Sequence, residues 1–374
     1  MRVLIAPDDY TGTLTAAQAA EAIASGWRSR APDDRLTLMP LSDGGPGFVG
    51  AIAAALDAQM LPVGVRGPMG ETAIGMVAMV EDVAYVEAAH GCGLALVHPD
   101  RRDARAATSY GVGQLIAAAL DAGARTIVVG LGGTASTDGG AGMLAALGAT
   151  ARDGSGASVA LDAGGTSVGD VATVDLAPAL RRVEGVDMVI ATDVDSPLLG
   201  ARGAARGFAP QKGADDVAVD ELEAALTTYA GIIGRGEDGK DPAVALGAGA
   251  GGGLGYGFMA LGARRQPGIA TVMDVVGLDA AITDTDLIIT GEGCFDWQSL
   301  RGKVVSGVAA AALEQGRPVV VIAGQVEVGK REYVALGITE AHAASADGAV
   351  PASPAEAARA LAARAARVAA QWSR

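Results

Sequence analysis

Acidic side chains and glycines occur together at five points in the chain, each directly after a short apolar run that is typical of a β-strand. The five clusters are residues 8–13, 42–45, 130–140, 192–195 and 291–296. Glycine-rich turns that lead into helices present free N–H groups, and the helix dipole favours an anion there. Carboxylates at neighbouring strand ends suit Mg²⁺, which takes one or two carboxylates together with phosphate oxygens. The pattern therefore indicates a nucleotide phosphate with a metal ion, and hence phosphoryl transfer.

Lysine is scarce, and two of the four lysines lie close to such glycine-rich or acidic segments. Lys212 precedes a glycine, and Lys303 follows the last acidic cluster at the start of a predicted helix. A lysine among glycines and carboxylates is suited to neutralise a phosphate. The alternative is that each lysine is solvated and that each cluster, taken singly, is a turn with a helix cap. Five clusters at strand ends favour the ligand-site interpretation over that alternative.

The composition fits a folded protein that does not bind nucleic acid. The chain has 374 residues, half of them apolar, and a formal net charge of −15. This length allows two or three domains, and the acidic balance lacks the basic stripe of nucleic-acid-binding proteins. Two cysteines, Cys92 and Cys294, suit a reducing cytosol. No signal peptide or membrane span is recognisable in the sequence, so we expect a cytoplasmic protein without a membrane partner.

Short β-branched runs alternate with alanine-rich helical patterns, which is typical of parallel α/β layers. Strands are expected at residues 3–6, 36–41, 126–131, 188–191, 287–290 and 319–323. Helices are expected at residues 15–28, 47–56, 108–122, 141–147, 215–232, 299–315 and 354–372. Residues 60–89 break the alternation, because three consecutive strand-like runs are joined there by turns. The sequence therefore predicts a doubly wound parallel sheet with a second subdomain inserted into it or grafted onto it.

Three weaker patterns carry less of the prediction. Residues 247–252 match the dinucleotide spacing GxGxxG, but no clear strand precedes them, so the match is rejected. Residues 234–240 resemble a phosphate-binding loop, but Asp241 stands where serine or threonine is needed. The three histidines lack metal-ligand spacing, and a structural role is favoured for His90, which follows a predicted strand.

Seven ordered blocks of the chain resemble the bacterial glycerate kinases of the first type. The blocks are residues 5–16, 42–45, 132–143, 193–200, 208–214, 247–252 and 290–303. They extend over nearly the whole chain, and their common order and spacing make the resemblance specific.

The resemblance implies ATP- and Mg²⁺-dependent phosphorylation of D-glycerate, with 2-phosphoglycerate or 3-phosphoglycerate as the product. It also implies two α/β domains. One is a discontinuous flavodoxin-like domain with a doubly wound parallel sheet, residues 1–60 plus 284–374. The other is an inserted mixed-sheet α/β domain, residues 61–283. The active site is then expected in the cleft between them, and a homodimer is compatible with this family.

On this interpretation each cluster has an expected role. Substrate or phosphate is expected to contact Gly132, Gly133, Thr134, Ser136, Asp138, Gly139, Gly251, Gly252, Glu292 and Gln298. The expected ligands of Mg²⁺ are Asp193, Asp195 and Asp296, with Glu292 as a further candidate. Lys212 and Lys303 are expected to neutralise the transferred phosphate oxygens. The hydroxyl proton is expected to pass to one of three carboxylates, Asp8, Asp43 or Asp193.

The chain departs from the family pattern at three positions. Thr11 replaces a basic residue, Pro46 replaces a glutamate, and Cys294 stands where arginine or serine is frequent. These departures leave two alternatives, namely a kinase for a different small hydroxy acid and a non-catalytic ligand-binding protein of the same fold. A dehydrogenase that binds NAD(P)H is the remaining class.

Overall fold

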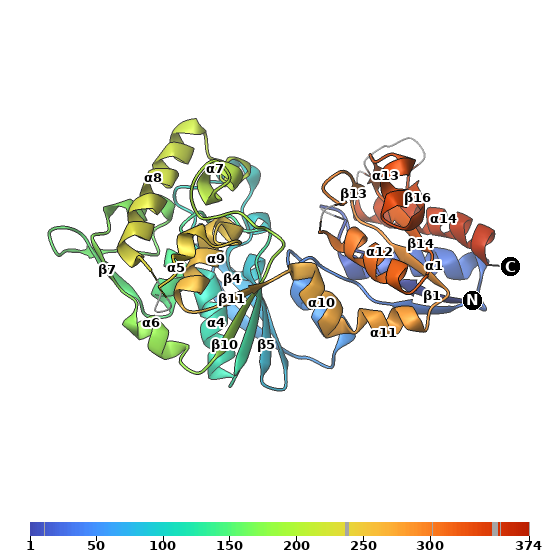
Figure 1. The fold of residues 1–374 in the computed structure, drawn as a ribbon, viewed down its shortest axis with the longest axis horizontal. Coiled ribbons are helices and arrows are strands. Elements are labelled where there is room, and N and C mark those ends of the chain that lie inside the picture. The colour runs from blue at the N-terminus through green and yellow to red at the C-terminus, as the bar shows by residue number, and fades with distance from the viewer. Residues whose placement is uncertain (11, 236–238, 301, 346–350, 352, 374) are drawn as a thin grey trace. The chain divides into compact units, whose positions relative to one another are not determined.

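A computed structural model describes residues 1–10, 12–235, 239–300, 302–345, 351 and 353–373 (Figure 1). Thr11, one of the three departures from the family pattern, lies outside the described residues. The chain forms two compact units. Unit 1 comprises residues 1–43, 50–57 and 268–374, and unit 2 comprises residues 44–49 and 58–267.

The sheet of unit 1 has five strands, all parallel to their neighbours. The strands are β1 (Arg2–Ile5), β2 (Arg35–Leu38), β12 (Leu287–Thr290), β14 (Val319–Ala323) and β16 (Ile338–Ala343). Their order across the sheet is β2-β1-β12-β14-β16. Numbered within the unit this is 2-1-3-4-5, the flavodoxin-like order of doubly wound sheets. The predicted doubly wound parallel sheet is confirmed.

Helices cover both faces of this sheet, because its strands are apolar on both sides. The helices of the unit are α1 (Ala16–Arg30), α10 (Gly268–Val276), α11 (Leu278–Thr283), α12 (Val304–Glu314), α13 (Lys330–Ala335) and α14 (Pro354–Trp372), together with α2 (Phe48–Ala55) from Gly50 onward. α1 and α14 pack together over the face that carries Val3, Ile5 and Ile289 (Figure 1). They approach closely at Gly26, where a side chain would overlap the backbone of Ala362. α12 contacts β12 and β14.

The return of the chain to unit 1 lies at Gly268, whereas the sequence-based boundary was placed at residue 284. The segment between these two positions forms α10 and α11, which pack against each other and against α12. Inside unit 1, the short strands β13 (Cys294–Phe295) and β15 (Gln325–Val326) also form a parallel pair.

Unit 2 contains a six-stranded mixed sheet in the order β11-β10-β6-β5-β4-β3. Its strands are β3 (Gln59–Arg66), β4 (Thr72–Val80), β5 (Val83–Glu87), β6 (Thr126–Gly130), β10 (Asp187–Ala191) and β11 (Arg264–Gln266). β3, β4 and β5 pair antiparallel, as the turns in residues 60–89 predict, and the remaining pairs are parallel. The second predicted domain, with a mixed sheet, is therefore confirmed as an α/β fold.

The helices of unit 2 flank this sheet, and several of them follow its strands along the chain. They are α3 (Ala88–Cys92), α4 (Tyr110–Asp121), α5 (Ala141–Ala146), α6 (Ala177–Arg182), α7 (Ala204–Phe208), α8 (Asp216–Ile233) and α9 (Ala250–Ala260). A small antiparallel sheet that the sequence did not reveal consists of β7 (Thr150–Arg152), β8 (Ser158–Val159) and β9 (Thr173–Asp175). Strands of two or three residues are too short to show a periodic pattern.

Candidate active site

Three carboxylates follow three adjacent strands of the unit 1 sheet. Asp8 follows β1, Asp43 follows β2 and Glu292 follows β12. β1 lies between β2 and β12, so the strand order reverses at β1. Open α/β sheets bind their ligands outside the carboxyl ends of the strands at such a reversal. The three carboxylates therefore lie at the position where this type of sheet binds ligands.

Burial changes the acidity of two members of this carboxylate cluster. Asp8 and Glu292 are buried, whereas Asp43 is half-buried. Burial, together with repulsion from Asp43, raises the pKa of Asp8 well above its usual range. Burial also raises the pKa of Glu292 to about 7. Desolvation disfavours the charged form of a carboxyl group, so both buried carboxyls hold a proton more readily than an exposed one does.

Lys303 is the cation that faces Glu292. It is the N-cap residue of α12, and its Nζ lies 3.7 Å from Oε2 of Glu292. Its charge lowers the pKa of Glu292 and so opposes the effect of burial. Oε1 of Glu292 is buried and has no hydrogen-bond partner among the described residues. A side-chain hydrogen bond from Ser299 also lowers the pKa of Glu292.

Asp296 shapes the loop between β13 and α12. Its Oδ1 accepts hydrogen bonds from the backbone N–H of Gln298 at 2.7 Å and of Ser299 at 3.2 Å. This is a side-chain-capped turn. The side chain of Gln298 is exposed. Asp296, an expected Mg²⁺ ligand, and Gln298, an expected phosphate or substrate ligand, therefore lie in the same unit as Glu292. One oxygen of Asp296 is already hydrogen-bonded to the backbone.

In unit 2, the loop of residues 130–140 follows β6, and Asp138 lies buried at its base. The carboxylate accepts hydrogen bonds from the backbone N–H groups of Ser109, Gly140 and Gly142 at 2.8, 3.1 and 3.2 Å. It also accepts one from the hydroxyl of Ser109 at 2.8 Å. Asp138 therefore holds the loop and the start of α5 in place, and its oxygens are occupied by the fold.

A small cavity of about 150 Å³ lies between this loop and the turn that carries Lys212. The expected phosphate ligands that line it are Gly132, Gly133, Thr134, Lys212, Gly251 and Gly252. Pockets for whole drug-sized ligands occupy roughly 300–1,000 Å³, so this one suits a single phosphate group. Ser136, also expected as a ligand, is buried, and its hydroxyl lies 3.7 Å from Sγ of Cys92.

Lys212 is buried in the wall of this cavity. Its Nζ donates a hydrogen bond to the carbonyl of Ser136 at 2.5 Å and lies 3.5 Å from Oγ1 of Thr134. Burial lowers the pKa of Lys212 to about 8, because desolvation disfavours the ammonium form. The ammonium still predominates at pH 7, so the cavity presents a positive charge and a hydroxyl group together.

Three consecutive glycines bring backbone against Lys212. Gly251, Gly252 and Gly253 have φ angles of 63°, 72° and 92°, in the left-handed region. A side chain on Gly252 would overlap the carbonyl of Ser136 and lie 2.8 Å from Nζ of Lys212. On the facing loop, a side chain on Gly139 would meet Leu226 at 3.0 Å. Gly251 and Gly252 therefore line the cavity, while Gly139 packs against Leu226 inside unit 2.

Asp193 and Asp195 follow β10 in unit 2, half-buried and exposed respectively. Val194, between them, lines the Lys212 cavity. Among the residues that the structure describes, no three or more His, Cys, Asp or Glu side chains form a group that could hold a metal ion. Mg²⁺ usually keeps several waters and binds through one or two carboxylates and phosphate oxygens. The described residues thus contain no all-protein cage for a metal ion, and the assignment of Asp193 and Asp195 to Mg²⁺ stays a prediction.

Glu87 is a buried carboxylate that the sequence did not single out. It ends β5, and its Oε2 accepts hydrogen bonds from the backbone N–H of Gly47 at 3.1 Å and of Val49 at 3.3 Å. His90 has a structural position beside it, with Nε2 3.8 Å from Oε1. The sequence offers only a glutamate at the end of a strand, and nothing in it indicates the distant N–H groups.

Pro46 lies next to Gly133, which lines the Lys212 cavity. Its side chain is exposed, and a Cβ on Gly133 would lie 2.7 Å from Cγ of Pro46. The departure at Pro46 therefore changes the surface beside a glycine that lines the cavity.

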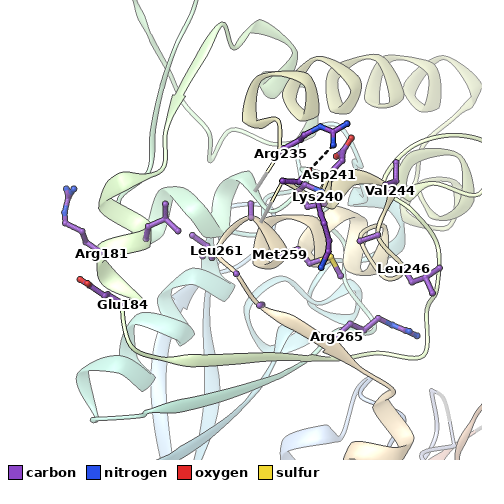
Figure 2. A pocket seen from close by; sticks show the side chains of 17 residues that line it. Arg181, Glu184, Arg235, Lys240, Asp241, Val244, Leu246, Met259, Leu261 and Arg265 are labelled. Atoms are coloured by element: carbon purple, nitrogen blue, oxygen red, sulfur yellow. Dashed lines mark hydrogen bonds between the residues drawn. The ribbon is translucent and has the colours of Figure 1, made fainter. Parts of the chain in front are cut away.

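A much wider pocket of about 1360 Å³ lies elsewhere in unit 2, between α6, the end of α9 and residues 239–246 (Figure 2). Val244, Leu246 and Leu261 give it an apolar lining. Figure 2 shows Arg181 and Arg265 at opposite sides of it, with their guanidinium groups far apart. Figure 2 also shows Arg235, Lys240 and Asp241 close together, and no described residue that lines this pocket also lines the Lys212 cavity.

Comparison with known proteins agrees with the geometry. The Glycerate kinase family model matches residues 3–373. Glycerate 2-kinase of Escherichia coli (strain K12) is 40% identical over 330 residues, 87% of this chain and 86% of that protein. Glycerate kinase of Bacillus subtilis (strain 168) is 38% identical over 355 residues, 94% and 92% of the two chains. The crystal structure of putative glycerate kinase 2 from Salmonella typhimurium LT2 has a TM-score of 0.81 and 36% identity, with 100% of both chains covered.

The comparisons identify an enzyme of the kinase class. The chain belongs to the glycerate kinase family, and the resemblance seen in the sequence is confirmed. In the part of the chain that the structure describes, no helix is both long and apolar enough to cross a membrane.

Proposed function

We propose that this enzyme transfers the γ-phosphate of ATP to a hydroxyl group of D-glycerate and that the product is 2-phosphoglycerate. The observation that carries the proposal is the buried ammonium of Lys212 in a glycine-lined cavity of phosphate size. The position of the new phosphate is inferred from the E. coli relative, which is named glycerate 2-kinase.

In this proposal unit 2 binds the phosphate that is transferred. Lys212 neutralises its oxygens, and Thr134, 3.5 Å from the ammonium, donates its hydroxyl to the same group. Backbone N–H groups of the glycine segments add further donors. Preorganised donors of this kind act on charge that spreads over the phosphate oxygens in the transition state.

Unit 1 supplies the groups that handle the acceptor. The carboxylate cluster of Asp8, Asp43 and Glu292 provides the base for the hydroxyl group, and Lys303 provides a nearby positive charge. A positioned carboxylate that removes the proton of an attacking hydroxyl contributes about 10²–10⁴-fold to the rate.

Mg²⁺ is the metal that ATP-dependent phosphoryl transfer normally requires, and it supplies charge neutralisation at the phosphate oxygens. Asp193 and Asp195 are the residues that would hold it, because they flank the cavity-lining Val194 at the end of β10. Asp296, whose Oδ1 is engaged by two backbone N–H groups, is the weaker of the three expected ligands.

We also propose that the enzyme is cytoplasmic. We further propose that it forms a homodimer. Both cysteines are free thiols, as expected for a reducing compartment. Light scattering after size-exclusion chromatography would show whether the chain is a monomer or a homodimer.

The test is ADP release with Mg-ATP and a panel of acceptors that contains D-glycerate, L-glycerate and related hydroxy acids. We expect turnover with D-glycerate, and a product that enolase accepts directly, which identifies the 2-phosphate. Turnover with another acceptor alone would support the kinase for a different hydroxy acid and would point to Pro46 and Cys294 as specificity residues. ATP binding without any turnover would favour the non-catalytic ligand-binding protein.

A further inference from the structure

We propose that Glu87 is a positioning residue of the Lys212 cavity, and that its carboxylate holds residues 44–49 against the glycine loop, residues 130–140. This inference rests on the proposed role of the cavity in binding the transferred phosphate. It gives a function to a buried carboxylate that the sequence did not single out. All the groups involved belong to unit 2.

Glu87 lies beside the start of the glycine loop in the sheet of unit 2. It is the last residue of β5, and in the parallel pair of β5 and β6 it is opposite Gly130, the last residue of β6. The glycine loop begins there, and its Gly132 and Gly133 line the Lys212 cavity. Glu87 is only 4% exposed, so its carboxylate must be satisfied inside the protein.

The carboxylate of Glu87 is bound by the backbone at the start of α2. Its Oε2 accepts hydrogen bonds from the N–H of Gly47 at 3.1 Å and of Val49 at 3.3 Å. A backbone hydrogen bond from Phe48 also lowers its pKa, and its other oxygen lies 3.8 Å from Nε2 of His90. The first N–H groups of a helix have no partner within the helix and favour an anion. One buried carboxylate therefore fixes three consecutive residues.

The segment that Glu87 holds has few other anchors. Residues 44–49 belong to unit 2, whereas the residues directly before and after them belong to unit 1. All six residues are described, and none of them is part of a strand, so no strand pairing fixes them to the sheet. The ring of Phe48 is buried, with its centroid 6.3 Å from that of Tyr85. The position of the segment thus depends on this ring and on the carboxylate.

The held segment and the glycine loop touch through their backbones. A Cβ on Gly130 would lie 2.5 Å from the carbonyl oxygen of Gly44, and a Cβ on Gly132 would overlap Cα of Gly45. Pro46 makes the next contact along the loop. Glycine is needed at these loop positions because the two backbones approach so closely. A shift of residues 44–49 therefore moves the wall of the cavity.

This contact lets Glu87 affect phosphoryl transfer without touching a reactant. Groups that bind a phosphate in the transition state act by being fixed in advance, and a misplacement of about 1 Å costs about 10²-fold in rate. Removing the carboxylate leaves N–H groups of α2 without an acceptor, which is unfavourable. The segment then shifts, and the glycine loop loses the surface against which it packs.

The first test compares Glu87→Ala with Glu87→Gln. Alanine removes the acceptor, whereas glutamine keeps an oxygen close to the same position. We expect Glu87→Ala to lower kcat/KM for ATP about 10²-fold and to weaken Mg-ATP binding measured by calorimetry, while Glu87→Gln stays close to the wild type. Hydrogen exchange of residues 44–49 should become faster in Glu87→Ala and not in Glu87→Gln.

Glu223→Ala is the matched control. Glu223 also lies in unit 2 and accepts a hydrogen bond from a backbone N–H, that of Gly200, at 2.7 Å. Neither of these two residues lines the Lys212 cavity. We expect the control to lower the unfolding temperature and to leave kcat/KM and Mg-ATP binding at wild-type values. Both alanine variants leave a backbone donor without its acceptor, so the comparison separates positioning from general stability.

Gly130→Ala disturbs the same contact from the side of the loop. The new methyl group would press on the carbonyl of Gly44, while Glu87 and the residues that line the cavity remain unchanged. We expect Mg-ATP binding to weaken as it does in Glu87→Ala. Wild-type binding in Gly130→Ala contradicts the inference, and this variant decides the question if Glu87→Ala fails to fold.

The outcomes separate this inference from the proposed function. A wild-type protein that binds Mg-ATP but phosphorylates no acceptor overturns the proposed function, while the binding measurements still test Glu87. A wild-type protein that does not bind Mg-ATP overturns both. Wild-type binding and kcat/KM in Glu87→Ala overturn the inference alone. Equal losses in Glu87→Ala and Glu87→Gln, or in Glu87→Ala and Glu223→Ala, also contradict it.

Discussion

Burial moves Lys212 and Glu292 toward neutrality from opposite directions. The pKa of Lys212 falls from 10.5 to about 8, and that of Glu292 rises from 4.5 to about 7. In each case desolvation disfavours the charged form, and burial of this kind is a common property of functional sites. Each residue therefore titrates close to the pH at which the enzyme is expected to work.

We expect Lys212→Met to lower kcat about 10²–10³-fold, the cost of losing one preorganised donor to a transition-state oxygen. In the wild type, activity falls as pH rises above about 8, because the ammonium is lost. The variant lacks this alkaline limb. Rate measurements from pH 6 to 10 test this, with Lys330→Met, at an exposed position on α13, as the control. An alkaline limb that persists in Lys212→Met contradicts the assignment.

Glu292→Gln should stabilise the protein at alkaline pH. A carboxyl whose pKa rises on folding contributes stability below its unfolded value of 4.5, and this contribution is lost as pH rises through about 7. Glutamine resembles the protonated form at every pH. At pH 8 we expect a gain of roughly 1–3 kcal/mol in the free energy of unfolding.

Urea unfolding at pH 4.5 and pH 8 checks this expectation. The difference between wild type and Glu292→Gln should appear at pH 8 and be small at pH 4.5. If Glu292→Gln destabilised the protein equally at pH 4.5 and pH 8, burial would not be destabilising the ionised form of Glu292.

The loop of residues 130–140 and the start of α9 pack closely against each other through their backbones. The N–H of Gly139 donates to the carbonyl of Gly252 at 3.1 Å, and a side chain on Gly253 would lie 2.6 Å from the Cα of Gly139. Because both segments consist largely of glycine, their backbones approach closely enough to enclose Lys212. The cavity therefore depends on this backbone contact as much as on its side chains.

Gly252→Ala should lower stability and activity by more than the strain of a left-handed backbone conformation alone would cause. The new methyl group would overlap the carbonyl of Ser136, which itself accepts the hydrogen bond from Lys212. Gly262→Ala is a matched control, since Gly262 has a φ of +88° with open space around it. We expect the control to lose about 1 kcal/mol, and Gly252→Ala to lose 1–3 kcal/mol more together with most of the activity.

Thermal unfolding and kcat of the two variants provide the comparison. Equal losses in stability and activity would show that the contact with Ser136 does not matter.

At the scale of the whole molecule, the sequence predicted those features that depend on local pattern. Alternating strands and helices gave the flavodoxin-like sheet, and the strand-end clusters gave Asp8, Asp43 and Glu292. The partners of Asp138 and Glu87 could not be predicted, because Ser109 and Gly47 are distant in sequence and carry no local signal. The burial of Glu292 is likewise a result of packing, which residue type and spacing do not encode.

The two units should refold in order. Strands β3, β4 and β5 of unit 2 pair as consecutive hairpins, whereas Val3 of β1 pairs with Leu287 of β12. Pairing distant segments requires closing a long loop first, which slows folding. In pulsed hydrogen exchange during refolding, we expect the amides of β4 and β5 to be protected before those of β1 and β12. Simultaneous protection of both sets would contradict this order.

The central position of β1 also has a consequence for synthesis on the ribosome. β1 and β2 leave the exit tunnel first, but β12, which covers the other side of β1, follows only after all of unit 2 has been translated. Until then the nascent chain carries an apolar strand with one unpaired edge, the kind of surface that promotes aggregation. We therefore expect the unpaired edge of β1 to need protection from aggregation until β12 has been translated.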